Sequence, residues 1–149
     1  MTVCPVGSAL LFAESVVMSG QSRLEGRGLK LALNQLIAAE MSPFALSLGL
    51  VQRATVPIDT FTAILRENAL FSPALEKKLP RLLTRDYKHP NFSARHLLKD
   101  VELFLKEASS YELTASSLEE IRQVLERNIA QRLGYSDYSG IFEMVNPIP

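Results

Sequence analysis

Apolar residues along the chain recur three and four positions apart, which is the spacing that places side chains on one face of an α-helix. Hardly any stretch alternates apolar and polar residues over five or more positions, as a half-buried β-strand would. The pattern therefore predicts an all-α fold, a helical bundle.

The longest predicted helix runs from about Leu24 to Arg53. Pro43 lies inside it, where a proline removes the amide that would bond to the carbonyl of Ala39 and presses its ring against that turn. We therefore expect a Pro-kinked central helix, bent or split between Ala39 and Pro43. The apolar side expected to be buried is formed by Leu29, Leu33, Leu36, Ile37, Phe44, Leu48 and Val51.

Two shorter helices are predicted next. Pro57 suits the first turn of a helix that ends near Asn68, and Ser72-Pro73 opens another. Pro80 is a second expected kink. That helix should stop before the turn-rich stretch of residues 86–91.

The second half of the domain continues with helices. One spans about Ser93 to Ser109. The next begins with a capping box, in which Ser117 and Glu120 bond each other's amides, and ends at Gly134. The tail after Tyr135 could add one short helix.

The N-terminal 25 residues give the weakest pattern, with a short helix from about Ser8 to Met18 as one reading. We therefore divide the chain into an N-terminal segment, residues 1–25, and a helical domain, residues 26–149. The apolar stretch from Ala9 to Met18 is interrupted by Glu14 and is too short to cross a bilayer of about 30 Å. Neither a signal peptide nor a membrane partner is expected.

Composition narrows the function classes further. The 149 residues include 16 basic and 16 acidic side chains, so the formal net charge is zero and no cation excess favours nucleic acid as a partner. With 47% apolar residues, the chain can bury the core of one compact domain. Cys4 is the only cysteine, which excludes an internal disulfide and makes a reducing compartment, the cytoplasm, the expected location.

Lys30 and Asn34 form the first candidate site. They lie four residues apart, so a helix places them on one face. A lysine can exchange the proton of a hydroxyl group, and an asparagine amide can hold the same oxygen, which suits a hydroxy acid or its carbonyl product. The alternative is that both are solvated surface residues, because spacing alone does not show burial.

The second candidate is Lys99-Asp100, a charged pair within an otherwise apolar helix face. The two side chains point about 100° apart, so at most one of them lies at the edge of the core. The alternative is a pair of surface charges beside the apolar stripe. His89 and His96 lack metal-ligand spacing to other residues and are expected at the surface, so no metal site is predicted.

Four segments then follow one another in a fixed order. The first is similar to a Gly-x-x-x-Lys-x-x-x-Asn motif and reads Gly26-Arg27-Gly28-Leu29-Lys30-Leu31-Ala32-Leu33-Asn34. The second is Ala54–Asp59, followed by Asn68. The third is Leu82–Tyr87, followed by Phe92 and by Leu97-Leu98-Lys99-Asp100, and the fourth is Tyr138–Phe142. Together they resemble the C-terminal helical domain of the β-hydroxyacid dehydrogenases, the family of 3-hydroxyisobutyrate dehydrogenase and tartronate semialdehyde reductase. The resemblance covers about residues 26–145. It implies a bundle like the C-terminal domain of the 6-phosphogluconate dehydrogenase-like enzymes.

The resemblance implies an NAD(P)-dependent oxidation of a small 3-hydroxy acid, or the reverse reduction. Lys30 matches the family's catalytic lysine and Asn34 its substrate-orienting asparagine. Lys99 and Phe92 match residues that lie near the nicotinamide cofactor. In the family a Rossmann domain supplies the phosphate-binding turn, and residues 1–25 cannot form one, so we expect NAD or NADP to bind only with a Rossmann-domain partner.

Two functions follow. The first is the C-terminal domain of such a dehydrogenase, which completes the active site, mediates homodimerisation and is inactive alone. The second is a non-catalytic helical interaction module, a homodimer whose lysines only confer solubility. Whether the chain is itself an enzyme is left open by its sequence, and so is the identity of its substrate.

Overall fold

The structure is a computed structural model that describes residues 23–148, with side chains from residue 28 onward. The short helix predicted near Ser8–Met18 lies outside the described residues. Within them every regular element is a helix, apart from one isolated antiparallel bridge between Ser93 and Asp137. The predicted all-α fold is confirmed.

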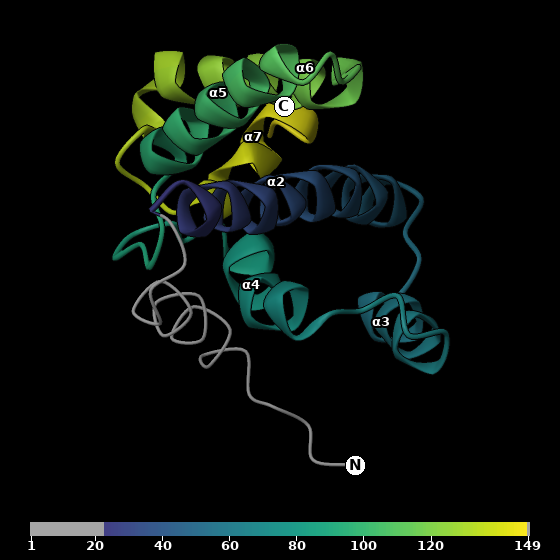
Figure 1. The fold of residues 1–149 in the computed structure, drawn as a ribbon. Coiled ribbons are helices and arrows are strands. Elements are labelled where there is room, and N and C mark those ends of the chain that lie inside the picture. The colour runs from purple at the N-terminus through teal and green to yellow at the C-terminus, as the bar shows by residue number, and fades with distance from the viewer. Residues whose placement is uncertain (1–22, 149) are drawn as a thin grey trace.

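The long helix α2 (Arg23–Arg53) forms the axis of the fold. In Figure 1 the helices of the second half of the chain lie on one side of α2, and the two that directly follow it lie on the other. The bounds of these helices are α3 (Ile58–Glu67), α4 (Pro73–Thr84), α5 (Ala94–Ser110), α6 (Ser116–Asn128) and α7 (Phe142–Val145).

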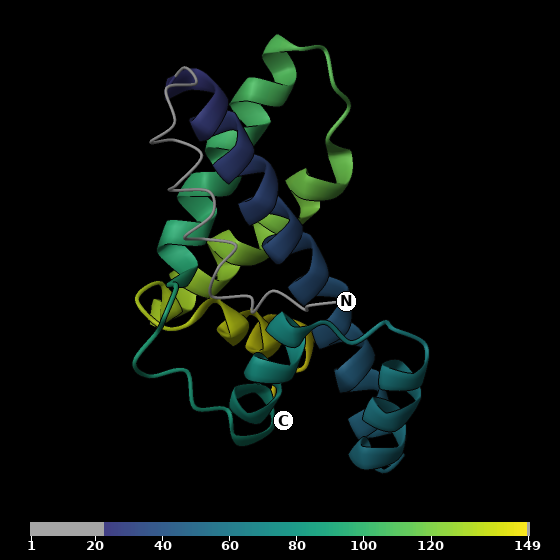
Figure 2. The same ribbon diagram turned by 60° about the horizontal axis from the view of Figure 1, so that its bottom comes forward.

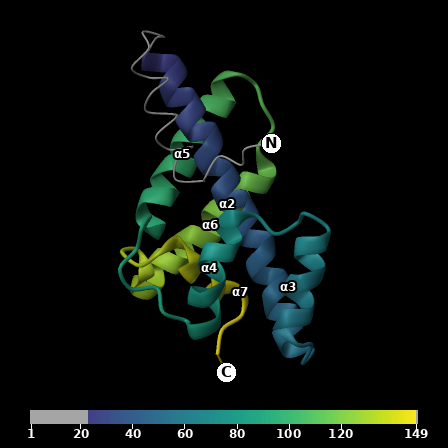
Figure 3. The same ribbon diagram turned by 90° about the horizontal axis from the view of Figure 1, so that it is seen from below.

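The two ends of α2 have different neighbours. Figures 2 and 3 show α5 beside its N-terminal half and α3 beside its C-terminal end, with α4 between them. At the α3 end, the ring of Phe44 packs against Phe61 and Phe71, with centroids 6.4 and 5.6 Å apart. The N-terminal half of α2 therefore has α4 and α5, rather than α3, as its neighbours.

The buried face of α2 agrees with the predicted one at Phe44 and Leu48 but differs from it toward the N-terminus. Its core positions recur mostly at intervals of three and four residues and include Leu31, Asn34, Ala38, Met41, Phe44, Ala45 and Leu48. Leu29, Leu33 and Leu36 are instead exposed by 43%, 38% and 57%. The prediction followed the largest apolar side chains, whereas small residues such as Ala38 and Ala45 let neighbouring helices pack close to α2.

Helix α2 is also continuous through Pro43, so of the two predicted outcomes, a bend or a split, the split does not occur. Pro43 is exposed, and the turn that lacks its amide bond therefore faces solvent rather than the core. Pro80 likewise lies inside the continuous helix α4. By length and composition alone, the Gly28–Arg53 part of α2 could cross a membrane, a property it shares with core helices of soluble proteins.

The starts of α5 and α6 compare differently with the prediction. Helix α5 begins at Ala94, next to the predicted start at Ser93, and Ser93 caps it by accepting the amide of His96. The capping box at Ser117 is wrong, because α6 begins at Ser116 and the carbonyl of Ala115 accepts the amides that close the first turn. Ser117 is therefore already inside the helix and cannot cap it.

The end of this helix also differs from the prediction. Helix α6 ends at Asn128 and continues as a π-helical turn, in which Arg132 rather than Gly134 has the left-handed conformation, with φ of 65°. Gly134 instead gives room to Ile129, because a Cβ atom at position 134 would lie 3.2 Å from Cγ1 of Ile129, a tight contact. Its carbonyl accepts the amide of Arg95 and so joins this turn to the start of α5.

Candidate functional site

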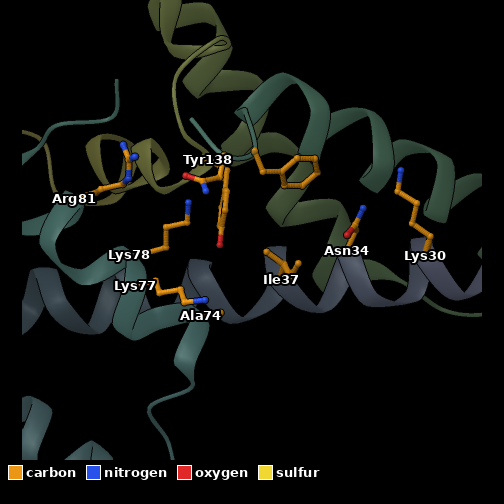
Figure 4. A pocket seen from close by; sticks show the side chains of 10 residues that line it. Lys30, Asn34, Ile37, Ala74, Lys77, Lys78, Arg81 and Tyr138 are labelled. Atoms are coloured by element: carbon orange, nitrogen blue, oxygen red, sulfur yellow. The ribbon is translucent and has the colours of Figure 1, made fainter. Parts of the chain in front are cut away.

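A pocket of about 440 Å³ lies between the N-terminal half of α2 and helix α4 (Figure 4). Helix α2 contributes Lys30, Asn34 and Ile37 to its lining. Helix α4 and the segments packed on it contribute Ala74, Lys77, Lys78, Arg81, Asn91, Phe92 and Tyr138. The pocket thus combines an apolar wall with several cationic groups and no acidic lining residue.

Lys30 and Asn34 project from successive turns of α2 toward the same side, as Figure 4 shows. Asn34 is buried, and its Nδ2 atom donates to Oδ2 of Asp100 on α5 at 2.6 Å. This bond fixes the amide plane and turns its oxygen away from Asp100. Lys30 is exposed in the described chain, so a ligand or a second domain at the pocket can reach its amine.

Phe92 also lines the pocket, whereas Lys99 does not. The half-buried ring of Phe92 packs edge-on against Tyr138, with centroids 6.1 Å apart. Lys99 is exposed on α5, and its neighbour Asp100 is the residue that faces α2. The structure therefore brings together three of the four predicted site residues and leaves Lys99 outside the pocket.

A buried ion pair supports the opposite side of the pocket. Nζ of Lys78 lies 2.6 Å from Oδ2 of Asp137, whose side chain is fully buried. The other carboxylate oxygen of Asp137 accepts the amide and the hydroxyl group of Ser139. The amine of Lys78 also lies 4.6 Å from the centre of the Tyr138 ring, so this lysine is held in a fixed position.

Arg81 is held by the loop that follows α4. Its guanidinium donates to the carbonyls of Lys88 and His89 at 2.6 and 3.0 Å. Carbonyl groups orient the guanidinium without neutralising its charge. Lys77, one turn earlier on α4, is exposed at the pocket.

Tyr138 is a neutral group at physiological pH. Burial raises the pKa of its hydroxyl above the usual value, and the nearby carboxylates of Asp137 and Glu40 raise it further. The ring stands across the pocket in Figure 4. Tyr138 can therefore donate a hydrogen bond to a ligand but does not supply an anion.

Several of these lining residues were not predicted. The cations Lys77, Lys78 and Arg81 share one face of α4, and their spacing of three and four residues was the signal that could have revealed them. Tyr138 was noted only as part of the closing family-like motif. Its place in the pocket depends on the bridge between Ser93 and Asp137, which no local pattern indicates.

The histidines lie at the surface, as expected: His89 and His96 are both exposed. His96 interacts through Nδ1 with the hydroxyl of the capping residue Ser93 at 2.9 Å. Among the described residues, no group of three or more histidine, cysteine or acidic side chains could hold a metal ion.

The comparisons with known proteins agree with this architecture. No curated protein sequence matches the chain. A crystal structure of 3-hydroxyisobutyrate dehydrogenase from Salmonella typhimurium superimposes with a TM-score of 0.70 at 18% identity, over 78% of this chain and 40% of that one. The chain thus spans less than half the length of this similar structure, and the likeness shows the fold.

A protein-family model provides the assignment. The model described as NAD-binding of NADP-dependent 3-hydroxyisobutyrate dehydrogenase matches residues 25–145, which is most of the chain and all of the pocket lining. The chain therefore belongs to this family of 3-hydroxyisobutyrate dehydrogenase domains, within the β-hydroxyacid dehydrogenases.

Proposed function

We propose that this pocket is the substrate-binding half of an NAD(P)-dependent 3-hydroxyacid dehydrogenase active site. The observation that carries the proposal is the position of Lys30 and Asn34, which line one pocket from successive turns of α2. The bond from Asn34 to Asp100 supports it, because a fixed amide can orient a substrate oxygen.

Lys30 and Asn34 have different roles in this proposal. Oxidation of a secondary or primary alcohol removes a proton from the hydroxyl oxygen as the hydride leaves carbon. In the reverse reduction, Lys30 as the ammonium donates its proton from Nζ to the carbonyl oxygen as the hydride arrives, and in the oxidation the amine takes that proton back. Asn34 holds the same oxygen in line with the lysine, and Phe92 and Ile37 form the apolar wall beside the carbon chain.

NAD(P), when bound, would supply the hydride acceptor. The half-buried ring of Phe92 offers a flat apolar surface to the nicotinamide end. The described residues contain no strand followed by a glycine-rich phosphate turn, so the phosphates need a Rossmann domain from elsewhere. Lys99 is exposed on α5 and does not line the pocket, so any contact between Lys99 and the cofactor would lie outside the pocket.

A complementation assay tests this function. The chain is mixed with NAD or NADP and 3-hydroxyisobutyrate, with and without a separately expressed Rossmann domain of the similar Salmonella enzyme, and NAD(P)H formation is followed. We expect no turnover from the chain alone, because correct placement of donor and acceptor contributes about 7–11 kcal/mol to such reactions. We expect turnover in the mixture.

A set of small 3-hydroxy acids replaces 3-hydroxyisobutyrate in a second series of assays. Absence of turnover with every acid and both cofactors, in a mixture shown by light scattering to form the complex, would contradict the dehydrogenase proposal. Turnover by the chain alone would contradict the part of the proposal that assigns the cofactor to a Rossmann domain.

The exposed side of α2 favours a second function, homodimerisation. Leu29, Leu33 and Leu36 continue along the helix to Leu46 and Leu50, and all five are exposed. Exposed leucines along one side of a helix are typical of an interaction surface. We propose that two copies of the chain pair through it, which can accompany the dehydrogenase function or replace it.

Charge placed on this face should dissociate such a dimer. The double variant Leu36→Glu/Leu50→Glu is expected to change the mass measured by light scattering from that of two chains to that of one, because carboxylates cannot be buried without partners. The control Ser109→Glu adds a charge at an exposed position of α5 and should leave the mass unchanged. A wild-type chain that is monomeric at every accessible concentration would contradict this proposal.

A further inference from the structure

We propose that the ligand of this pocket carries two anionic groups, one bound near Lys30 and Asn34 and the other near Lys77 and Arg81. The inference rests on the proposed function and names its substrate class: a small hydroxy acid with a second carboxylate or a phosphate at its far end. A 3-hydroxy monocarboxylate such as 3-hydroxyisobutyrate would occupy only one of the two ends.

The cationic groups lie at opposite ends of the pocket. Figure 4 shows Lys30 and Asn34 at one end, on α2, and the basic residues of α4 at the other. Ile37 lies on α2 between them. Phe92 also lines the pocket, with its ring centroid 6.1 Å from that of Tyr138. The pocket therefore suits an elongated ligand with a short carbon chain in the middle and charges at its two ends.

The charges at the α4 end are not all equivalent. Lys78 already has a counter-ion, because the buried carboxylate of Asp137 lies 2.6 Å from its amine. Arg81 donates to two carbonyls, which fix it but leave its charge. Lys77 has no ion-pair partner among residues 28–148, so it and Arg81 provide two cations that an anion could neutralise.

No acidic side chain of residues 28–148 lines the pocket beside these cations. Asp100 bonds to the amide of Asn34, and Asp137 pairs with Lys78. Glu40 lies near Tyr138, and Asp86 follows α4 near Arg81, but neither of them lines the pocket. Lys77 and Arg81 are four residues apart on one helix and have no acidic lining residue beside them in the described chain, so they repel each other, and like charges at this spacing destabilise a helix.

A second anionic group on the ligand would remove this repulsion. A carboxylate or phosphate can accept hydrogen bonds both from the exposed amine of Lys77 and from the guanidinium of Arg81, which its carbonyl partners hold in place. Arginine is the residue type best suited to bind such groups. A monoanion bound at Lys30 leaves the α4 end uncompensated. The pocket should therefore prefer dianions, and the preference should depend on Lys77.

Binding measurements on the full chain test this preference without any turnover. Amide resonances of α2 and α4 are followed by NMR during titration with 3-hydroxybutyrate, malate and 3-phosphoglycerate at constant ionic strength. We expect malate and 3-phosphoglycerate to bind about fivefold to tenfold more tightly than the monoanion, the range given by one partly exposed charge-assisted contact. Lys77→Ala should reduce this preference to less than about twofold, and Lys77→Arg should retain it.

Lys106→Ala is the matched control, because Lys106 is an exposed lysine of α5 that does not line the pocket. Equal affinities for all three acids, a preference that survives Lys77→Ala, or an equal loss in Lys106→Ala would overturn the proposal. So would failure of all three acids to bind at millimolar concentration.

A further titration with NADH identifies the source of the second anion. If only NADH binding depends on Lys77, the α4 cations serve the cofactor phosphates, and the substrate proposal is wrong. The dianion preference and the proposed dehydrogenase function can fail separately. A mixture with the Rossmann domain could oxidise 3-hydroxyisobutyrate even when the chain shows no preference for dianions.

Discussion

Replacing Lys30 by methionine should lower kcat of the complemented enzyme by about 10²- to 10⁴-fold, the range for losing a positioned general acid or base. Methionine keeps the unbranched stem of the side chain but cannot accept the hydroxyl proton. KM for the hydroxy acid should change much less, because Asn34 still holds the oxygen. Initial rates of NAD(P)H formation over a range of substrate concentrations separate the two parameters.

The control for this variant is Lys106→Met, which makes the same change at an exposed position of α5 that does not line the pocket. Its kcat should lie within about twofold of the wild-type value, the usual size of effect at an unrelated surface position. If Lys30→Met is as active as this control while both fold and bind the Rossmann domain, Lys30 has no role in proton transfer.

The sequence predicted the α2 part of the site better than the α4 part. Lys30 and Asn34 share a helix, so their spacing alone places them on one face. Phe92 was found only through its family-like position ahead of Lys99-Asp100. The α4 cations could be assigned to the site only from the tertiary structure, because two lysines followed by an arginine are equally typical of a solvent-exposed helix face.

The same limit explains the errors in the fold. Leu29, Leu33 and Leu36 have the periodicity of a buried stripe, but the helices pack on the side of Ala38 and Ala45 instead. Periodicity therefore indicated that α2 is apolar on more than one side. It did not indicate which of these sides packs against the other helices of the chain. Most helix starts were predicted more closely, because start signals such as Ser72-Pro73 are local in the sequence.

Removal of the buried carboxylate of Asp137 should have the largest effect on stability. Asp137→Ala is expected to lower the free energy of unfolding by about 3–5 kcal/mol, because it leaves the amine of Lys78 in a mostly buried position without a counter-ion. It also removes the acceptor for the amide and hydroxyl of Ser139. Urea unfolding, analysed by linear extrapolation, measures the change.

An exposed ion pair of the same fold provides the control. Arg66 and Glu76 lie 2.9 Å apart with side chains that are 49% and 58% exposed, so Arg66→Ala should cost no more than about 1 kcal/mol. A loss in Asp137→Ala as small as that in Arg66→Ala would show that Lys78 finds water when its partner is removed. The Lys78–Asp137 pair would then not be the element that fixes the α4 side of the pocket.

A double-mutant cycle separates the ion pair from the other bonds of Asp137. Lys78→Met alone leaves a buried carboxylate and should also destabilise the chain, whereas Lys78→Met combined with Asp137→Ala should cost less than the sum of the two single variants. Asp137→Asn keeps an acceptor for Ser139 but loses the charge. If Asp137→Asn is as unstable as Asp137→Ala, the charge of the pair, rather than the bonds to Ser139, holds the Tyr138 turn and helix α4 together at the pocket.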